Sequence, residues 1–316
     1  MKNPFYYIAG ICILLFACNA ISQPRPLPTP TFTLLPPTET ATHLPTLAPA
    51  ATFTASPIPT ATWVHQGPTH IIVPILLYHH IDTSPNNSRY YVSPEKFDEE
   101  MKLLHDWGYT TITLDMLTRA INEGADLPPR PMLITFDDGH LNAYTAAFPI
   151  MQKYGFTGIL YIVGTYMGAD GFMNVDQIKE MVAAGWEVGS HSMRHLDLTR
   201  LDKTEQIYEI SHSRKFLEEQ LGIPIQSFAY PFGLSNVDLA DLTYALGYTT
   251  AMSLGYSNDQ GSGNLLALQR RDIQGTYDLK QFSAFLPWQG DPVFLPTDTS
   301  TPTLPPTRTP RPTAVR

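Results

Sequence analysis

The feature that most restricts the fold of this chain is an alternation of strand-like and helix-like segments between residues 70 and 286. Short apolar runs such as 132–136 predict buried strands, and apolar residues three or four apart, as at 202–221, predict helices. The order β-α recurs six or seven times. Such repeats call for parallel strands with right-handed crossovers, in a barrel or an open sheet. No Gly-x-Gly-x-x-Gly follows a strand, and we expect an α/β fold of the distorted (β/α) barrel type.

The predicted elements account for most of this region. Ser93 and Pro94 predict a helix start, as N-cap and first-turn residue, and Gly108 predicts its end. The strands are expected at 70–81, 110–114, 132–136, 156–163, 186–189, 227–230 and 248–253. The helices are expected at 94–107, 116–122, 142–154, 175–184, 202–221, 237–246 and 278–286. In a barrel of this kind the functional residues lie where strands end and loops begin.

Two segments rich in Pro and Thr flank the predicted domain. Residues 23–62 contain 10 Pro and 11 Thr, and residues 296–316 contain 6 Pro and 7 Thr. Such segments have too few large apolar side chains to offset the entropy of ordering them. We therefore expect a disordered linker over 23–67, one folded domain over 68–295 and a disordered tail over 296–316.

Charge and cysteine content exclude several classes of partner and site. The 68–295 region has 15 Lys and Arg against 27 Asp and Glu, so its acidic surface repels nucleic acid. Cys12 and Cys18 are the two cysteines of the chain. The predicted domain therefore has neither a disulfide nor a thiolate metal site, and any metal it holds must use His and carboxylate ligands.

The N-terminus predicts export of the domain. Lys2 precedes an apolar run from Phe5 to Ala17, which suits a signal peptide over 1–22 and is short for a membrane span. Leu15–Cys18 resembles a bacterial lipoprotein cleavage box, with lipid on Cys18. Ordinary cleavage near Ala20, or an uncleaved anchor, are the alternatives. We expect either a cell-surface lipoprotein or a secreted protein, touching the membrane only through that lipid, and we take it to be a monomer.

Three clusters of chemically active residues fall at predicted strand ends. Asp137 and Asp138 are adjacent carboxylates, which are costly to bury unless a cation compensates them. His191 and His195 stand four residues apart, and two imidazoles with one carboxylate suit zinc. The third cluster is Tyr230–Gly233. Taken singly, each has an ordinary structural explanation: an acidic turn, two packed histidines or an aromatic turn.

In this order, the segments Thr135–Gly139, His191–His195 and Tyr230–Gly233 resemble the motifs of the polysaccharide deacetylase family, the NodB-homology group. The resemblance covers about residues 74–286. Pro74–His79 resembles a branch that includes extracellular poly-N-acetylglucosamine deacetylases, in which a motif that stands late in most relatives stands near the front.

The resemblance implies a divalent metal, usually Zn2+, bound by Asp138, His191 and His195. A metal of this kind polarises a carbonyl and acidifies bound water, which makes an amide open to attack.

The resemblance also implies three catalytic groups. Asp137 is the implied general base, His79 the implied general acid, and the Phe232 backbone N–H an implied donor to the oxyanion. His80 is adjacent to His79, and because neighbouring strand residues face opposite sides we expect only His79 to enter the site.

One position departs from the family pattern. Many relatives carry an Arg just before the third motif to hold the catalytic Asp, and here Ser227, Phe228 and Ala229 stand there. Arg270 or Arg271 can supply that cation, and we favour Arg270.

Three functions remain open at this point. The first is a metal-dependent hydrolase that removes N-acetyl groups from an extracellular glucosamine-containing polysaccharide. The second is an O-acetyl esterase on a hemicellulose such as xylan, since the same machinery serves both reactions. The third is a non-catalytic glycan-binding surface protein, against which the complete residue set argues.

Overall fold

The computed structural model describes residues 63–291. The predicted signal peptide, the linker up to residue 62 and the tail from residue 296 lie outside the described residues. All of the strands and helices of the described fold lie within 63–291.

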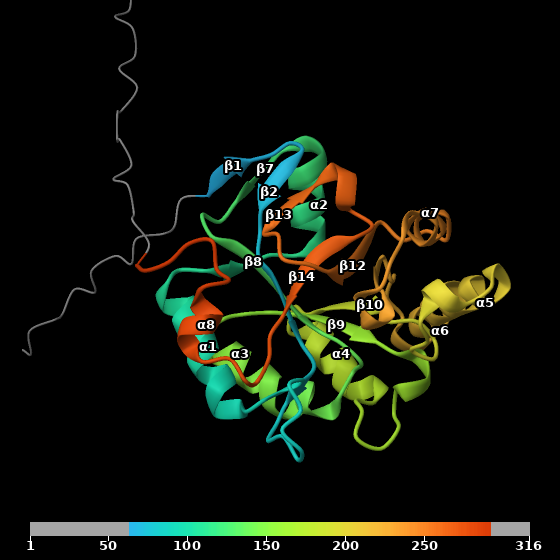
Figure 1. Ribbon diagram of the computed structural model, residues 1–316, viewed down its shortest axis with the longest axis horizontal. Helices are drawn as coiled ribbons and strands as arrows, with labels where there is room; N and C mark the ends of the chain where they lie inside the picture. Colours follow the sequence, from blue (N-terminus) through green and yellow to red (C-terminus); the bar gives the residue numbers. More distant parts are fainter. Residues whose placement is uncertain (1–62, 292–316) are drawn as a thin grey trace, which may run out of the picture. The chain divides into compact units, whose positions relative to one another are not determined.

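Seven parallel strands close into a barrel, which confirms the predicted fold (Figure 1). Neighbouring strands follow chain order, and the last pairs with the first to complete the ring. A two-residue strand, β6 (Thr110–Thr111), extends the sheet beside β8. The barrel strands are β3 (Ile75–Tyr78), β8 (Pro131–Phe136), β9 (Ile159–Ile162), β10 (Glu187–Ser190), β11 (Ser227–Ala229), β12 (Thr250–Leu254) and β14 (Leu268–Asp272).

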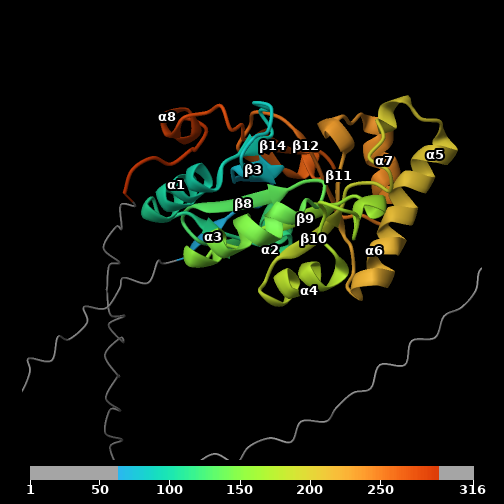
Figure 2. The same ribbon diagram turned by 90° about the horizontal axis from the view of Figure 1, so that it is seen from below.

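Helices surround the barrel, with α1 and α8 on one side and α5, α6 and α7 on the opposite side (Figures 1 and 2). The helix start predicted at Ser93 is confirmed, because its hydroxyl accepts from the Lys96 N–H. The helices are α1 (Pro94–Asp106), α2 (Leu114–Glu123), α3 (Phe148–Lys153), α4 (Val175–Ala183), α5 (Lys203–Ile207), α6 (Ser213–Leu221), α7 (Val237–Ala245) and α8 (Leu279–Ser283). None of them is long and apolar enough to cross a membrane.

Two predicted helices contain a widened turn. The stretch expected at 142–154 begins with a π-helical turn, Ala143–Ala147, that leads into α3. The helix expected at 202–221 consists of α5, a π-helical turn at Tyr208–His212, and α6. Wider turns of this type occur often at functional sites.

The prediction of one strand over 70–81 is wrong. Three short strands stand there: β2 (His70–Ile72), β3 and β4 (His80–Ile81). Pro74, which lacks an N–H, separates the first two, and the chain leaves the barrel at His79. Only β3 belongs to the barrel, while β2 pairs with β13 (Asp259–Gly261) and β4 with β5 (Tyr91–Val92).

One further strand lies inside the segment expected to be linker. Val64–Gln66 forms β1, which pairs antiparallel with β7 (Ala125–Leu127). The folded region therefore includes residues before the expected boundary at 68.

The barrel has an inner and an outer layer of buried side chains. Leu133 and Tyr161 belong to the inner cluster, while Ile134 and Phe136 belong to the outer cluster that the helices cover. This follows from the two-residue period of a strand, which sends neighbouring side chains to opposite faces. The same period carries Thr135 and Asp137 to the inner side, at the carboxyl end of β8.

Candidate active site

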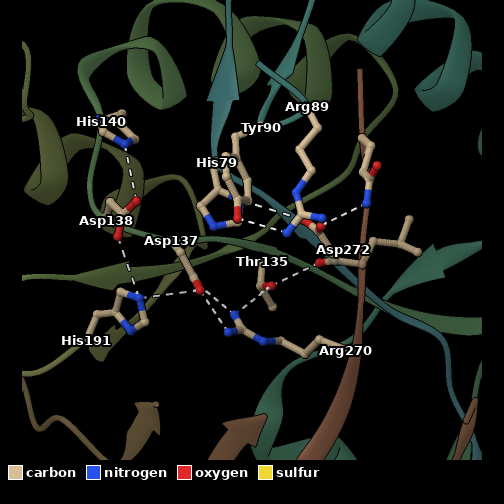
Figure 3. Close-up of polar contacts among 12 residues, drawn as sticks. His79, Arg89, Tyr90, Thr135, Asp137, Asp138, His140, His191, Arg270 and Asp272 are labelled. Carbon is tan, nitrogen blue, oxygen red and sulfur yellow. Dashed lines mark hydrogen bonds and ion pairs between the residues drawn. The ribbon is translucent and has the colours of Figure 1, made fainter. Parts of the chain in front are cut away.

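The two predicted acidic residues occupy different positions, and Asp137 is held by Arg270 (Figure 3). Arg270 Nη1 lies 2.6 Å from Asp137 Oδ1, and Nη2 lies 2.8 Å from Oδ2. Both residues are buried, and Arg270 Nη1 also donates to the Thr135 hydroxyl at 3.2 Å. Burial opposes ionisation of Asp137, but Arg270 first and His191 next outweigh it and hold the pKa of this carboxyl below its usual value. Asp137 is therefore a carboxylate at neutral pH.

The structure decides between the two candidate arginines. Arg270 points into the barrel, whereas Arg271 donates to the Tyr256 carbonyl and packs over the rings of Tyr256 and Phe285. The expectation that Arg270 supplies the missing cation agrees with this geometry.

Asp138, His191 and His195 converge on one point. Their ligand atoms all lie within 4.8 Å of one another. Asp138 Oδ1 lies 3.6 Å from His191 Nε2 and 3.4 Å from His195 Nε2. Ligands at 2.0–2.1 Å from a tetrahedral zinc ion stand roughly 3.3 Å apart, so these separations fit such an ion. Asp138 Oδ1 is buried and has no hydrogen-bond partner in the described region, as expected of an oxygen that faces a cation.

Contacts around the two imidazoles prepare them as ligands. His191 Nδ1–H donates to the Ala229 carbonyl at 2.8 Å, which leaves the Nε2 lone pair directed at Asp138. Burial, reinforced by His191, lowers the pKa of His195, so that its ring is neutral at neutral pH. His140 Nε2 lies 3.3 Å from the second oxygen of Asp138 and orients this carboxylate from the other side (Figure 3).

Backbone strain is concentrated at this site. Asp138, Ser192, His195 and Phe232 have φ values of 69°, 66°, 57° and 60°. Residues other than glycine rarely adopt this left-handed backbone conformation, which costs about 1–3 kcal/mol per residue. Because four such residues lie in the three motifs, the surrounding structure must hold their backbones in conformations that these residues do not prefer.

His79 lies beside the ring of Tyr90 and near Asp272 on β14 (Figure 3). Its Nδ1 is 3.9 Å from Asp272 Oδ1, and its ring centroid is 4.8 Å from that of Tyr90. Both of these polar atoms are buried and unpartnered in the described region. Burial lowers the pKa of His79, while the charges of Asp137, Asp138 and Asp272 oppose this shift. At 3.9 Å the two atoms are not hydrogen-bonded, but they are close enough for the charge of Asp272 to favour the protonated form of His79.

The expectation that only one of the adjacent histidines enters the site is wrong. His80 also lines the cavity, where it stacks on His140 at 3.6 Å and on Tyr91 at 4.0 Å. Strict alternation fails because His79 lies between β3 and β4, outside either strand. The Asn142 amide donates to His80 Nδ1 at 3.2 Å and fixes the ring at the rim.

A cavity of about 460 Å³ connects these groups. Phe232 lies on its rim with 55% of its surface exposed, and its ring meets that of His195 edge to face at 4.7 Å. Tyr90 and Leu254 complete an apolar rim. The lining residues are Leu77, His79, His80, Ser88, Arg89, Tyr90, Tyr91, Asp137, Asp138, His191, His195, Phe232, Gly233, Leu254 and Asp272.

Sequence reasoning missed Asp272. A signal for it was available, since Arg270 and Asp272 stand two apart in a strand-like segment and therefore face the same side. Arg270 contacts Asp137, and Asp272 lies 3.9 Å from His79.

Known proteins resemble this chain in sequence. A model of the family described as polysaccharide deacetylase matches residues 124–251. YxkH of Bacillus subtilis (strain 168), named as a polysaccharide deacetylase, is 31% identical over 232 residues, which cover 72% of this chain and 80% of that protein. A poly-β-1,6-N-acetyl-D-glucosamine N-deacetylase of Staphylococcus aureus is 27% identical over 186 residues, and the match spans 54% of this chain and 64% of that enzyme.

Solved structures show the same barrel. The deacetylase PplD of Streptococcus pyogenes, solved in complex with acetate, superposes with a TM-score of 0.65 and 26% identity over 69% of this chain and 99% of its own. IcaB of Ammonifex degensii has a TM-score of 0.54 and 26% identity over 69% of this chain and 95% of its own. With the converging motifs and the extent of these matches, the chain belongs to the polysaccharide deacetylase family.

Proposed function

We propose that this protein removes N-acetyl groups from a glucosamine-containing polysaccharide outside the cell, using one divalent metal ion, Zn2+. The observation that carries the proposal is that Asp138 Oδ1 lies close to the Nε2 atoms of both His191 and His195. Asp137, the proposed base, lies beside this group and is held by Arg270. The similarity to a named poly-N-acetyl-D-glucosamine deacetylase supports an amino-sugar substrate.

Asp138, His191 and His195 would hold the metal, which when bound polarises the acetyl carbonyl and acidifies a water molecule. Asp137, ionised beside Arg270, takes the proton from the attacking water.

The remaining roles belong to His79 and Phe232. His79, which lines the same cavity, protonates the leaving amine, and Asp272 stabilises its charged form. The backbone N–H of Phe232 donates to the oxyanion, a contribution worth about 3–4 kcal/mol for donors of this kind.

The shape of the cavity favours a polymer over a small molecule. Tyr90, Phe232 and Leu254 leave exposed apolar surface around an open cavity. Such surface suits the apolar faces of successive pyranose rings. The N-terminal sequence supports an extracellular location for the proposed enzyme, as a lipoprotein carrying lipid on Cys18 or as a secreted protein. Such a location suits a polymer too large to enter a cell.

The proposal is tested by acetate release from the purified full chain. Acetylated glucosamine oligomers and acetylated xylan serve as substrates, with and without a chelator. We expect chelator-sensitive release from the glucosamine oligomers and one divalent ion per chain. Release from acetylated xylan alone would select the esterase reaction, and glycan binding without any release would select a binding protein.

Matched variants locate the metal. His195→Ala is expected to lose both the ion and the activity, whereas His212→Ala removes an exposed imidazole on the helical layer and is expected to retain both. A His195→Ala protein that still binds a stoichiometric ion would overturn the assigned site.

A further inference from the structure

We propose that Glu209 is a positioning residue that holds the loop between the two metal-binding histidines. It does so by accepting hydrogen bonds from two successive backbone N–H groups of that loop. This inference rests on the proposed function, since it concerns how this chain shapes the site for its metal.

The loop His191–His195 adopts a conformation that its own residues do not favour. Ser192 and His195 both have positive φ values, at 66° and 57°. A loop of this kind keeps its shape only when surrounding groups determine it. The separations between the ligand atoms depend on that shape, because both imidazoles are carried by it.

The carbonyl groups of the loop are held by the neighbouring segment after β9. Gly164 N–H donates to the Ser192 carbonyl at 3.1 Å, and Thr165 N–H donates to the Met193 carbonyl at 2.9 Å. Gly164 permits this approach, since a Cβ there would lie 2.5 Å from the Met193 sulfur. Inside the loop, His195 N–H donates to the Ser192 hydroxyl at 2.9 Å.

The amide groups of the loop are held by one carboxylate oxygen. Glu209 Oε2 accepts from the N–H of Met193 at 3.0 Å and from the N–H of Arg194 at 2.8 Å. The other oxygen, Oε1, accepts from the Arg194 side chain. Two convergent donors fix the orientation of two consecutive peptide planes, which a single hydrogen bond does not.

The position of Glu209 in the fold is itself unusual. The residue is fully buried, and it lies on the π-helical turn between α5 and α6. A carboxylate is costly to bury unless its oxygens are hydrogen-bonded, and here the partners belong to the loop that carries the metal ligands. Ile210 beside it packs in the core and fixes the turn. Glu209 therefore joins the packed helical layer to the loop that carries the two imidazoles, and so restrains their positions.

The test measures metal affinity of the full chain. The protein is stripped with a chelator and titrated with Zn2+ or Co2+ against a chromophoric competitor, at a temperature where circular dichroism shows each variant to be folded. Glu209→Ala removes both acceptors and is expected to weaken metal binding about 10- to 100-fold, as loss of groups that orient metal ligands does. Glu209→Met, which fills most of the same volume, carries the same expectation if the alanine variant does not fold.

Three further variants separate positioning from general structural support. Glu209→Gln keeps an acceptor oxygen and is expected to bind metal more like the native chain than like Glu209→Ala. Arg194→Met breaks the ion pair but keeps the backbone N–H groups, so metal affinity is expected to stay near native. Glu100→Gln alters another buried glutamate, which accepts from Tyr78 rather than from the loop, and is also expected to leave affinity unchanged.

Native metal affinity in folded Glu209→Ala or Glu209→Met would overturn the inference. So would a loss in Arg194→Met as large as that in Glu209→Ala, because the ion pair would then carry the effect. Failure of the proposed function is distinguishable. If the metal site is wrong, the native chain itself binds no Zn2+ or Co2+; if only the reaction is wrong, the native chain binds the ion but releases no acetate from glucosamine oligomers.

Discussion

Arg270 and Asp137, which stand 133 residues apart in the chain, form a two-point contact at the carboxyl end of the barrel, with N–O distances of 2.6 and 2.8 Å. The cation that contacts this aspartate comes from β14, whereas Ser227 on β11, just before the third motif, contacts the Tyr161 hydroxyl at 2.7 Å. The guanidinium of Arg270 lies 5.3 Å from the centre of the Tyr161 ring, and this cation–π contact stabilises its position.

Replacing Arg270 should damage both activity and stability. Arg270→Met leaves the buried Asp137 carboxylate unpaired, which typically costs about 3–5 kcal/mol of stability. Arg270→Lys keeps the charge but not the two-point geometry, so we expect kcat/KM to fall by roughly 100-fold or more while folding persists. Acetate-release kinetics and denaturant unfolding measure the two effects. Arg271→Lys, at the neighbouring residue that packs on Tyr256, is the control, and equal losses in both lysine variants would contradict the assignment.

Asp272 should set the alkaline limit of activity. Its negative charge favours the protonated form of His79, so Asp272→Asn lowers the pKa of His79. Because the proposed acid must be protonated, the alkaline limb of the kcat/KM profile should move to lower pH. The acidic limb, which reports on Asp137, should move less.

A pH–rate profile of Asp272→Asn beside Asp241→Asn, an exposed carboxylate on α7, provides the comparison. An alkaline limb that stays in place in the Asp272 variant would remove His79 from the role of acid.

Glu100 should make the protein less stable as pH rises. Burial raises the pKa of Glu100 to about 8, although the hydrogen bond from the Tyr78 hydroxyl opposes the shift. The unfolded chain releases this proton near its ordinary value of about 4.3, so the stabilisation is complete below that pH and is lost as pH rises toward 8. Each unit of difference in pKa corresponds to about 1.4 kcal/mol.

The free energy of unfolding should therefore decline between pH 5 and 8 in the native chain, and Glu100→Gln should flatten that decline. Urea unfolding at several pH values measures it. Glu99→Gln, next to it on the exposed side of α1, should leave the slope unchanged. Identical slopes in the native chain and Glu100→Gln would show that this group does not control the pH dependence.

Phe232 should contribute to the binding of long substrates through its ring. Phe232→Ala keeps the backbone N–H but removes an exposed aromatic surface from the cavity rim. We expect KM for acetylated oligomers to rise roughly 3- to 10-fold, in line with the energy of one aromatic contact, with a smaller change in kcat. Tyr244→Ala, an exposed aromatic on α7, is the control. A fall in kcat with unchanged KM would place the ring in catalysis instead.

Much of this architecture was predictable because its signals are local. Apolar runs and helical spacing predicted the barrel strands β8 to β12 in their order, and Ser93 and Pro94 predicted a real helix start. The closing strand β14 was not among the expected strands, and the strand expected at 110–114 is the two-residue β6 outside the ring. The segment 70–81 failed because its apolar character hides two interruptions, at Pro74 and His79, which break one run into three strands. The apolar composition of a segment indicates that it is buried, but it does not show where the chain leaves a sheet.

The sequence by itself determined which chemically active side chains lie at strand ends, because a strand end and a motif are each defined by residues that follow one another in the chain. Only the tertiary structure decided which of them come into contact. Arg270, and not Arg271, binds Asp137, and Asp272 lies beside His79. Glu209 accepts hydrogen bonds from the loop His191–His195. These contacts exist because the barrel closes and a helical layer packs on it. Distance along the chain carries no information about such closure.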